Sequence, residues 1–250
     1  MWRYLPLLPV DPDAPRPPLR VGWTPLYAAP RLGDRLGLHH LWVKDDGQNP
    51  TASLKDRASA LAVTRAMAEG AEVITTASTG NAAAALAGMA ASVDMPAVIF
   101  VPKDAPRAKI VQHLVYGARV LLVDGTYDQA FDLALQASEA FGWYNRNTAY
   151  NPFMSEGKKS VAYEICEQLD WQAPDRIFVS VGDGCILGAV HKGLRDLKAV
   201  GWIDRMPRLM GVQAEGCCPL VDAFKCGIEG WEMTACQAET VADSICAGLP

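Results

Sequence analysis

The sequence predicts an α/β protein with doubly wound, mostly parallel sheets, because short apolar runs alternate with amphipathic stretches along most of its 250 residues. Several of the apolar runs are rich in valine and isoleucine, as expected for strands that are buried on both faces. Hydrophobic residues make up 50% of the chain and charged residues 20%, which is usual for a globular enzyme. We therefore expect ligands to bind at the loops that follow the strands.

The individual elements follow from this pattern. Residues 5–18 contain six prolines, which predicts an extended arm over the surface. The expected strands are 41–43, 72–76, 97–101, 119–123, 176–181 and 208–213. The expected helices are 54–69, 81–91, 107–116, 127–141, 157–169 and 187–198. The first of these helices has its apolar residues near one face, and Gly70 is typical of a helix stop.

Composition excludes several classes of function. The net charge is −5 and no dense run of lysine or arginine occurs, so we expect no nucleic-acid partner. No signal peptide is apparent, and the alanine-rich run 82–91 is too short to cross a membrane, which predicts a cytoplasmic protein. The seven cysteines lack a CxxC motif, and the four histidines fit no metal-binding spacing. We expect reduced thiols and no metal site.

The stretch 49–57 places a lysine, Lys55, at the start of a helix. Asn49-Pro50 is typical of a turn, and Ser53 followed by Asp56 is typical of an N-cap with a weak capping box. The positive end of the helix dipole disfavours the ammonium form, and only a neutral amine can form a Schiff base. This segment alone fits a reactive lysine or a solvated one equally well.

A second polar loop, 76–81, follows a predicted strand and opens a predicted helix. Its Ser78, Thr79 and Asn81 side chains, together with the N–H groups of the helix start, could bind a carboxylate or a ring oxygen. An ordinary helix cap, closed by Ser78 or Thr79, explains the same residues.

The third loop, 181–188, is rich in glycine and again lies between a strand and a helix. Glycines allow a phosphate to approach the backbone N–H groups. Their spacing is GxGxxxG and not the dinucleotide fingerprint GxGxxG, and Asp183 would repel a pyrophosphate unless it points away. The three loops together offer an amine, polar groups for a ring and a carboxylate, and a site for one phosphate. Pyridoxal 5'-phosphate requires this combination.

These motifs give the chain a family resemblance. It resembles threonine synthase and its relatives among the fold-type II pyridoxal-phosphate enzymes, the tryptophan-synthase-β-like group. The resemblance rests on GWTPL (22–26), NPTASLKDR (49–57), ASTGN (77–81), NPFMSEGKKS (151–160), VGDGCILG (181–188) and GVQAEG (211–216). It extends over nearly the whole chain.

The resemblance implies roles for particular residues. Lys55 would form the Schiff base with the cofactor and then move protons, Asn81 would bind the phenolic oxygen of the cofactor, and Ser78 and Thr79 would bind the substrate carboxylate. The cofactor phosphate would be bound by Gly182, Asp183, Gly184, Cys185 and Ile186. The resemblance also implies a large domain, 1–57 with 151–250, and a small domain, 58–150, whose motion closes the site between them.

The sequence departs from the family pattern at several positions. Ala52, Leu54 and Ala58 replace glycine, phenylalanine and glycine and are conservative in size, and Ala82 replaces a small hydroxyl residue. Met154 stands where relatives carry an arginine that suits a phosphorylated substrate. The cations that could replace this arginine are Arg146, Lys158 and Lys103.

The end of the chain also differs, because relatives continue beyond the segment 239–250 with a long C-terminal portion. That portion supplies the partner of the pyridine nitrogen. Without it apolar sheet surface would be exposed, which favours a homodimer.

We therefore expect a pyridoxal-phosphate-dependent carbon–oxygen lyase that acts on an amino acid with a side-chain leaving group, as in the conversion of O-phosphohomoserine to threonine and phosphate. Three alternatives stay open. They are β-elimination or β-replacement, as in serine/threonine dehydratases or sulfur-incorporating synthases, a truncated non-catalytic homologue, and, disfavoured by the glycine spacing, a nicotinamide-dependent oxidoreductase.

Overall fold

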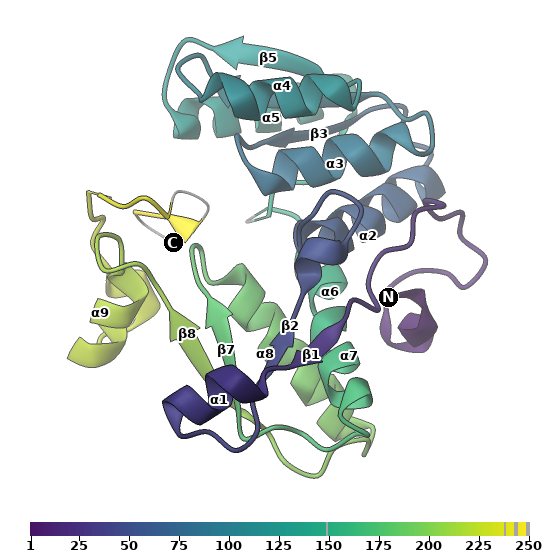
Figure 1. Cartoon of the computed structure of the whole chain (residues 1–250). Coiled ribbons are helices and arrows are strands. Elements are labelled where there is room, and N and C mark those ends of the chain that lie inside the picture. Colours follow the sequence, from purple (N-terminus) through teal and green to yellow (C-terminus); the bar gives the residue numbers. More distant parts are fainter. Residues whose placement is uncertain (149, 238, 243–244, 249–250) are drawn as a thin grey trace. The chain divides into compact units, whose positions relative to one another are not determined.

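The computed structural model of the chain describes residues 1–148, 150–237, 239–242 and 245–248 (Figure 1). The chain divides into two units, Met1–Ser160 and Val161–Pro250. The division expected from the resemblance, with 58–150 as a separate small domain, stays a prediction. No helix among the described residues is long and apolar enough to cross a bilayer.

The N-terminal region is more structured than its prolines suggested. Residues Trp2–Leu7 form a 3-10 helix, η1, that contains Pro6, and both Tyr4 and Leu8 are buried. The predicted extended surface arm is therefore wrong over its first residues, because burying these apolar side chains outweighs the proline preference for extended backbone. The N-terminal amino group of Met1 donates to the carbonyl of Val21 at 2.6 Å, which fixes the chain end.

The next elements lead to the first predicted loop. Strand β1 (Leu26–Ala28) pairs antiparallel with β2 (Trp42–Lys44), and the connection between them contains helix α1 (Pro30–Leu36). A short 3-10 helix, η2 (Asp46–Gln48), follows β2 directly. Helix α2 (Lys55–Ala68) then begins within one residue of its predicted start.

The first unit contains a four-stranded parallel sheet (Figure 1). Its strand order is β5-β4-β3-β6, with bounds Arg119–Val123, Ala97–Pro102, Ile74–Ala77 and Tyr144–Asn145. The connecting helices are α3 (Asn81–Ala91), α4 (Arg107–Val115) and α5 (Tyr127–Phe141). This alternation confirms the predicted parallel α/β organisation.

Strand β4 shows how the sheet is covered on both faces, since every residue of it is buried. Ala97, Ile99 and Val101 belong to the larger core cluster, which contains residues of α2 and α3. Val98 and Phe100 belong to a second cluster with residues of α5. Successive side chains of a strand point to opposite faces, so the alternation places α5 across the sheet from α2 and α3.

Helix α2 packs closely against helix α6 (Phe153–Lys158). The close approach depends on Gly157, because a Cβ atom there would lie 2.8 Å from Ala58 Cα and still closer to the Arg57 carbonyl. Gly157 therefore allows the backbones of α2 and α6 to meet at Arg57 and Ala58, next to Lys55 in the sequence.

The second unit is built on a pair of parallel strands, β7 (Arg176–Ser180) and β8 (Arg208–Val212), aligned from Arg176↔Arg208 to Ser180↔Val212. Helix α8 (Cys185–Ala199) connects these strands and contacts both of them. The remaining elements are α7 (Ser160–Gln168, which starts at the unit boundary), α9 (Pro219–Cys226) and η3 (Gly230–Glu232). The single helix predicted over 157–169 is in fact α6 followed by α7.

The packing of α6 on α2 generates a prediction for Gly157→Ala. The added methyl group would have to displace backbone atoms, so we expect the free energy of unfolding to fall by about 1–3 kcal/mol. Gly188→Ala is the matched control, because a Cβ atom at Gly188 meets nothing within 4 Å. Alanine has a higher helix propensity than glycine, so this substitution within α8 should not lower the free energy of unfolding. Urea denaturation of both variants tests this, and equal stabilities of Gly157→Ala and wild type would contradict it.

Candidate functional site

Lys55 is the first residue of α2, in the first helical turn as the sequence predicts, and its side chain is half-buried. The Ser53 hydroxyl oxygen accepts a hydrogen bond from the Lys55 backbone N–H at 3.0 Å. The N-cap residue of α2 is Leu54, whose side chain makes no capping hydrogen bond, so the predicted N-cap at Ser53 is wrong by one residue. The expected return contact of a capping box is absent from the described contacts of Asp56. That part of the prediction is wrong, because Asp56 has a different partner.

The carboxylate of Asp56 holds the loop that precedes Lys55. It accepts hydrogen bonds from the Thr51 backbone N–H at 2.8 Å and from the Thr51 hydroxyl at 2.6 Å. Burial raises the pKa of Asp56, and the two hydrogen bonds from Thr51 oppose this shift. The loop 51–56 is thus closed on itself around one buried carboxyl group.

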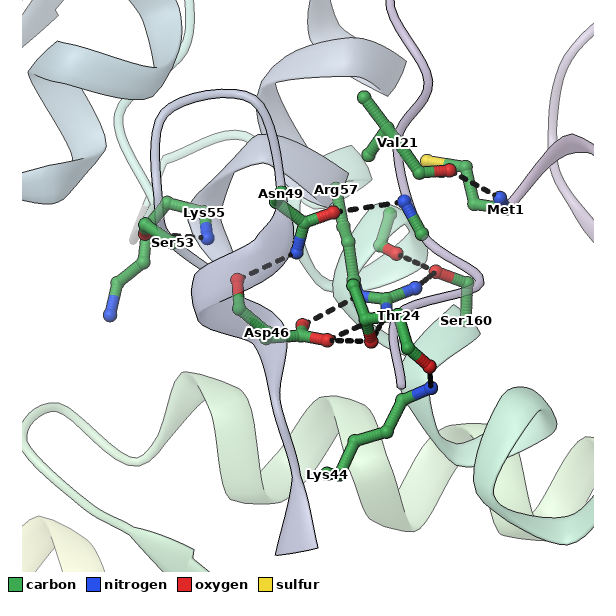
Figure 2. A network of polar contacts seen from close by, with 12 residues as sticks. Met1, Val21, Thr24, Lys44, Asp46, Asn49, Ser53, Lys55, Arg57 and Ser160 are labelled. Atoms are coloured by element: carbon green, nitrogen blue, oxygen red, sulfur yellow. Dashed lines mark hydrogen bonds and ion pairs between the residues drawn. The ribbon is translucent and has the colours of Figure 1, made fainter. Parts of the chain in front are cut away.

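Arg57 is fully buried and forms a two-pronged ion pair with Asp46 of η2 (Figure 2). Arg57 Nε donates to Asp46 Oδ2 at 2.7 Å, and Nη2 donates to Oδ1 at 2.8 Å. The same guanidinium donates to the Ser160 hydroxyl at 3.2 Å and to the Thr24 hydroxyl at 3.3 Å. One side chain therefore joins four segments of the first unit.

A second set of contacts continues this network around Asp46 (Figure 2). The Thr24 hydroxyl donates to Asp46 Oδ1 at 2.7 Å, and Asn49 Nδ2 donates to the Asp46 carbonyl at 3.0 Å. Asn49 Oδ1 in turn accepts from the Gly22 N–H at 2.9 Å. The motifs 22–26 and 49–57 are thereby bonded together, while the Lys55 side chain points away from the network (Figure 2).

Ala52, in the middle of the same loop, adopts a left-handed backbone with φ of +58°. This conformation favours glycine, the residue that the family pattern has at this position. The replacement is conservative in size, as the sequence indicated, but it is unfavourable for the backbone.

The polar loop between β3 and α3 contains Ser78, Thr79 and Asn81. The Ser78 hydroxyl oxygen accepts from the Gly80 N–H at 3.2 Å and closes the turn before α3. The N-cap residue of α3 is Gly80, without a side-chain capping hydrogen bond, so the interpretation of Ser78 or Thr79 as an ordinary helix cap is wrong. The O–H group of Ser78 can still donate to a ligand. Asn81 is exposed as the first residue of α3, and Thr79 is half-buried. All three residues are accessible at the carboxyl end of β3.

Asn147 braces this loop and was missed by the sequence analysis. Its Oδ1 accepts from the Thr76 hydroxyl at 2.9 Å and from the Ala77 N–H at 2.8 Å. The Tyr127 hydroxyl donates to the backbone carbonyl of the same residue, Ala77, at 3.2 Å. The only signal in the sequence is the asparagine-rich run 145–151 after a short strand.

The glycine loop belongs to the second unit and precedes α8. Gly184 is the N-cap of α8 and has φ of +79°, a conformation that favours glycine. The Asp183 carboxylate accepts from the Cys185 N–H at 3.0 Å. The loop therefore fits an anion through the N–H groups at a helix start, but Asp183 competes for one of them. Ile186 and Gly182 are half-buried beside these residues.

Met154 is fully buried in the core of the first unit, so its position offers no surface to a substrate phosphate. Of the cations that could replace the arginine of relatives, Arg146 and Lys158 are themselves buried. Lys103 is exposed and pairs with Asp124 at 3.5 Å.

Comparison with known proteins agrees with the resemblance. Residues 18–249 match the family described as pyridoxal-phosphate dependent enzyme. The chain is 41% identical over 226 residues to the threonine synthase of Methanocaldococcus jannaschii and 39% identical over 253 residues to that of Methanosarcina acetivorans. These alignments cover 90% and 100% of this chain but 56% and 61% of the relatives. The chain thus spans less than two thirds of their length.

Solved structures agree on the fold. The processed form of threonine deaminase isoform 2 from Solanum lycopersicum superposes with a TM-score of 0.74 at 24% identity, covering 90% of this chain and 59% of that one. Maize serine racemase superposes with a TM-score of 0.76 at 22% identity, covering 91% and 66%. At these identities the likeness supports the predicted fold class alone.

Two alanines that replace family glycines should respond oppositely to restoration of glycine. Ala52→Gly relieves a left-handed alanine and should raise the free energy of unfolding by about 0.5–1 kcal/mol. Ala58→Gly removes a buried methyl group from the interior of α2 and should lower it by about 1 kcal/mol or more. Denaturation curves of both variants measure these changes in the free energy of unfolding. A loss of stability in Ala52→Gly would contradict the left-handed backbone conformation of Ala52.

The ion pair between Arg57 and Asp46 predicts that Asp46→Asn destabilises the protein by about 3 kcal/mol or more, because the buried guanidinium loses its counter-charge. Asp124→Asn is the matched control, since it breaks an ion pair whose two side chains are 66% and 89% exposed. Asp124→Asn should therefore change the free energy of unfolding by no more than about 0.5 kcal/mol. Similar decreases in melting temperature for the two substitutions would show that the buried pair contributes no more to stability than the exposed pair.

Proposed function

The chain belongs to the family of pyridoxal-phosphate-dependent enzymes, and from this premise we propose that it is a carbon–oxygen lyase of the threonine synthase type. The reaction would convert O-phosphohomoserine and water to threonine and phosphate. The observation that carries the proposal is Lys55 in the first turn of α2, followed by two residues whose side chains are fixed in buried polar contacts. Relatives that are named threonine synthase, at 36–41% identity in several organisms, support it.

The residues of the loops fit the cofactor of this family. We assign the aldehyde of pyridoxal 5'-phosphate to Lys55 Nζ, its phenolic oxygen to the amide of Asn81, and the substrate carboxylate to Ser78 and Thr79. The residues assigned to the phosphate are Gly182, Asp183, Gly184, Cys185 and Ile186. When bound, the cofactor supplies a conjugated ring that accepts the electron pair left at the substrate α-carbon.

Within this proposal the Nζ atom of Lys55 has two chemical roles. It holds the cofactor before the substrate arrives, and afterwards it takes the proton from the substrate α-carbon. Both roles require a neutral amine. The place of Lys55 in the first turn of α2 supports the proposal, because the positive end of a helix dipole disfavours a further positive charge.

Met154 gives specific support to a second reaction, β-elimination or β-replacement at an amino acid without a phosphate group. The position at which relatives carry an arginine is here apolar and fully buried. A substrate such as serine or threonine would not need that cation.

We further propose that the protein acts as a homodimer in the cytoplasm. No disulfide joins the cysteines in the described part of the chain, which suits a reducing compartment. The large domain, 1–57 with 151–250, and the small domain, 58–150, remain part of the proposal.

Absorbance of the purified protein with added pyridoxal 5'-phosphate tests the role of Lys55. Wild type should develop a visible band and retain the cofactor on Lys55 after borohydride reduction, as located by peptide mass spectrometry. Lys55→Ala should show neither, whereas Lys103→Ala, which removes an exposed lysine, should behave like wild type. A reduced cofactor found on another lysine of the wild-type protein would contradict the assignment.

The two candidate reactions differ in their products. Incubation with O-phosphohomoserine should release inorganic phosphate and threonine in equal amounts. Formation of oxo-acids from serine or threonine, without phosphate release from O-phosphohomoserine, would favour the second reaction.

A further inference from the structure

A close contact joins helix α3 to the lysine loop, the residues 51–54 directly before Lys55. Gly88 lies in α3 and is buried, and a Cβ atom there would lie 2.6 Å from Thr51 Cγ2. Side chains do not approach one another so closely, so α3 packs at this distance from the lysine loop only because residue 88 is glycine. Thr51 itself is 7% exposed. The proposed function gives neither Thr51 nor Gly88 a role.

The Thr51 side chain cannot turn away from Gly88 without losing its other contacts. Its hydroxyl donates to Asp56 Oδ1 at 2.6 Å, and its backbone N–H donates to Asp56 Oδ2 at 2.8 Å. Asp56 is the second residue of α2 and is fully buried. Oγ1 and Cγ2 of a threonine turn together about one bond, so the hydrogen bond that holds the hydroxyl also fixes the methyl group that faces Gly88. Thr51 is therefore a rigid spacer between α2 and α3.

The contact also determines which side of α3 faces the lysine loop. Asn81 is the first residue of α3, and Gly88 lies seven residues further along the same helix. Residues with this separation lie on the same face of an α-helix, about 10 Å apart along its axis. Because Gly88 faces Thr51, Asn81 lies on the side of α3 that is turned toward the lysine loop.

Other contacts hold α3 and the loop before it. The backbone N–H and carbonyl of Ala77 bind Asn147 and Tyr127, which fixes the loop between β3 and α3. Helices α2 and α3 pack against each other, and both contribute residues to the larger core cluster. The contact between Thr51 and Gly88 adds a direct connection between α3 and the lysine loop.

We propose that Thr51 and Gly88 are positioning residues for the cofactor, because their contact sets the separation between Lys55 and Asn81. This inference rests on the proposed function, which assigns the cofactor aldehyde to Lys55 and the phenolic oxygen to Asn81. The aldehyde and the phenolic oxygen are attached to neighbouring carbons of the pyridoxal ring, so their two partners on the protein must keep a fixed spacing.

Gly88→Ala tests the spacing. The added methyl group must move α3 away from the lysine loop or displace Thr51 from Asp56, and either shift alters the separation between Lys55 and Asn81. We expect the dissociation constant of pyridoxal 5'-phosphate to rise about tenfold, the size of coupling usual for residues in direct contact. The maximum of the visible band should also shift, because the absorbance of the bound cofactor depends on the hydrogen bond to its phenolic oxygen.

Thr51→Ser provides a compensating change. It keeps the hydroxyl that binds Asp56 and removes only the methyl group that faces Gly88. The double variant Gly88→Ala/Thr51→Ser should therefore accommodate the alanine, with a dissociation constant within about threefold of that of Thr51→Ser alone. A general loss of stability in α3 would not be relieved in this way.

Thr64→Ser is the matched control for the compensation. It also removes a methyl group from a buried threonine, and Thr64 lies in α2 but is not among the nearest neighbours of residue 88. The double variant Gly88→Ala/Thr64→Ser should bind the cofactor as weakly as Gly88→Ala.

The test uses the full chain, titrated with pyridoxal 5'-phosphate and followed by visible absorbance, and circular dichroism without the cofactor verifies folding. If Gly88→Ala does not fold, folding and cofactor binding of Gly88→Ala/Thr51→Ser support the proposal, and failure of that double variant to fold overturns it. An unchanged dissociation constant and band in Gly88→Ala, or equal relief by Thr51→Ser and Thr64→Ser, would overturn this inference alone. Absence of the band in wild type would overturn the proposed role of Lys55 and this inference with it.

Discussion

The buried ion pair between Arg57 and Asp46 is the interaction on which the candidate site depends. Removing two charges from water costs several kcal/mol for each ion, and the cost is recovered only with close geometry and further hydrogen bonds. Both conditions are met, because the guanidinium contacts both carboxylate oxygens and also the hydroxyls of Thr24 and Ser160. The contacts are specific in direction, so they fix the orientation of the start of α2 and do not merely stabilise it.

This constraint explains why the lysine has a defined place. Asp56 and Arg57 follow Lys55 directly, and their side chains bind the preceding loop and η2. With its two neighbours held in the interior, Lys55 is directed to the other side of the helix (Figure 2). The polar loop after β3 is fixed in a comparable way, since Asn147 binds the backbone N–H of Ala77 and Tyr127 binds its carbonyl. In both loops buried polar contacts position the residues that are left accessible to a ligand.

Much of the fold could be predicted because burial on both faces gives the parallel strands an unmistakable pattern. Strands β3, β4 and β5 and helices α3 and α5 lie within a few residues of their expected bounds. The short strands β1 and β6 are too brief for any periodic signal, and η1 was concealed by its prolines. The motifs identified Lys55 and the loops, but not Asp46 or Asn147. Asp46 lies 11 residues from its partner Arg57, and Asn147 lies 70 residues from its partner Ala77, so no short sequence motif contains either contact. The left-handed backbone of Ala52 could not be predicted either, because similar side-chain size says nothing about backbone conformation.

The central claim, that the buried pair positions Lys55 for its cofactor, is tested most directly by a double-mutant cycle with cofactor binding as the readout. The dissociation constant of pyridoxal 5'-phosphate would be measured for wild type, Asp46→Asn, Arg57→Met and the double variant, under conditions in which all four are folded. If the pair positions Lys55, each single variant should bind pyridoxal 5'-phosphate more weakly than wild type, and the double variant should bind it at least as tightly as the weaker single variant. Unchanged dissociation constants in all three variants would show that the pair supports the fold without positioning the lysine.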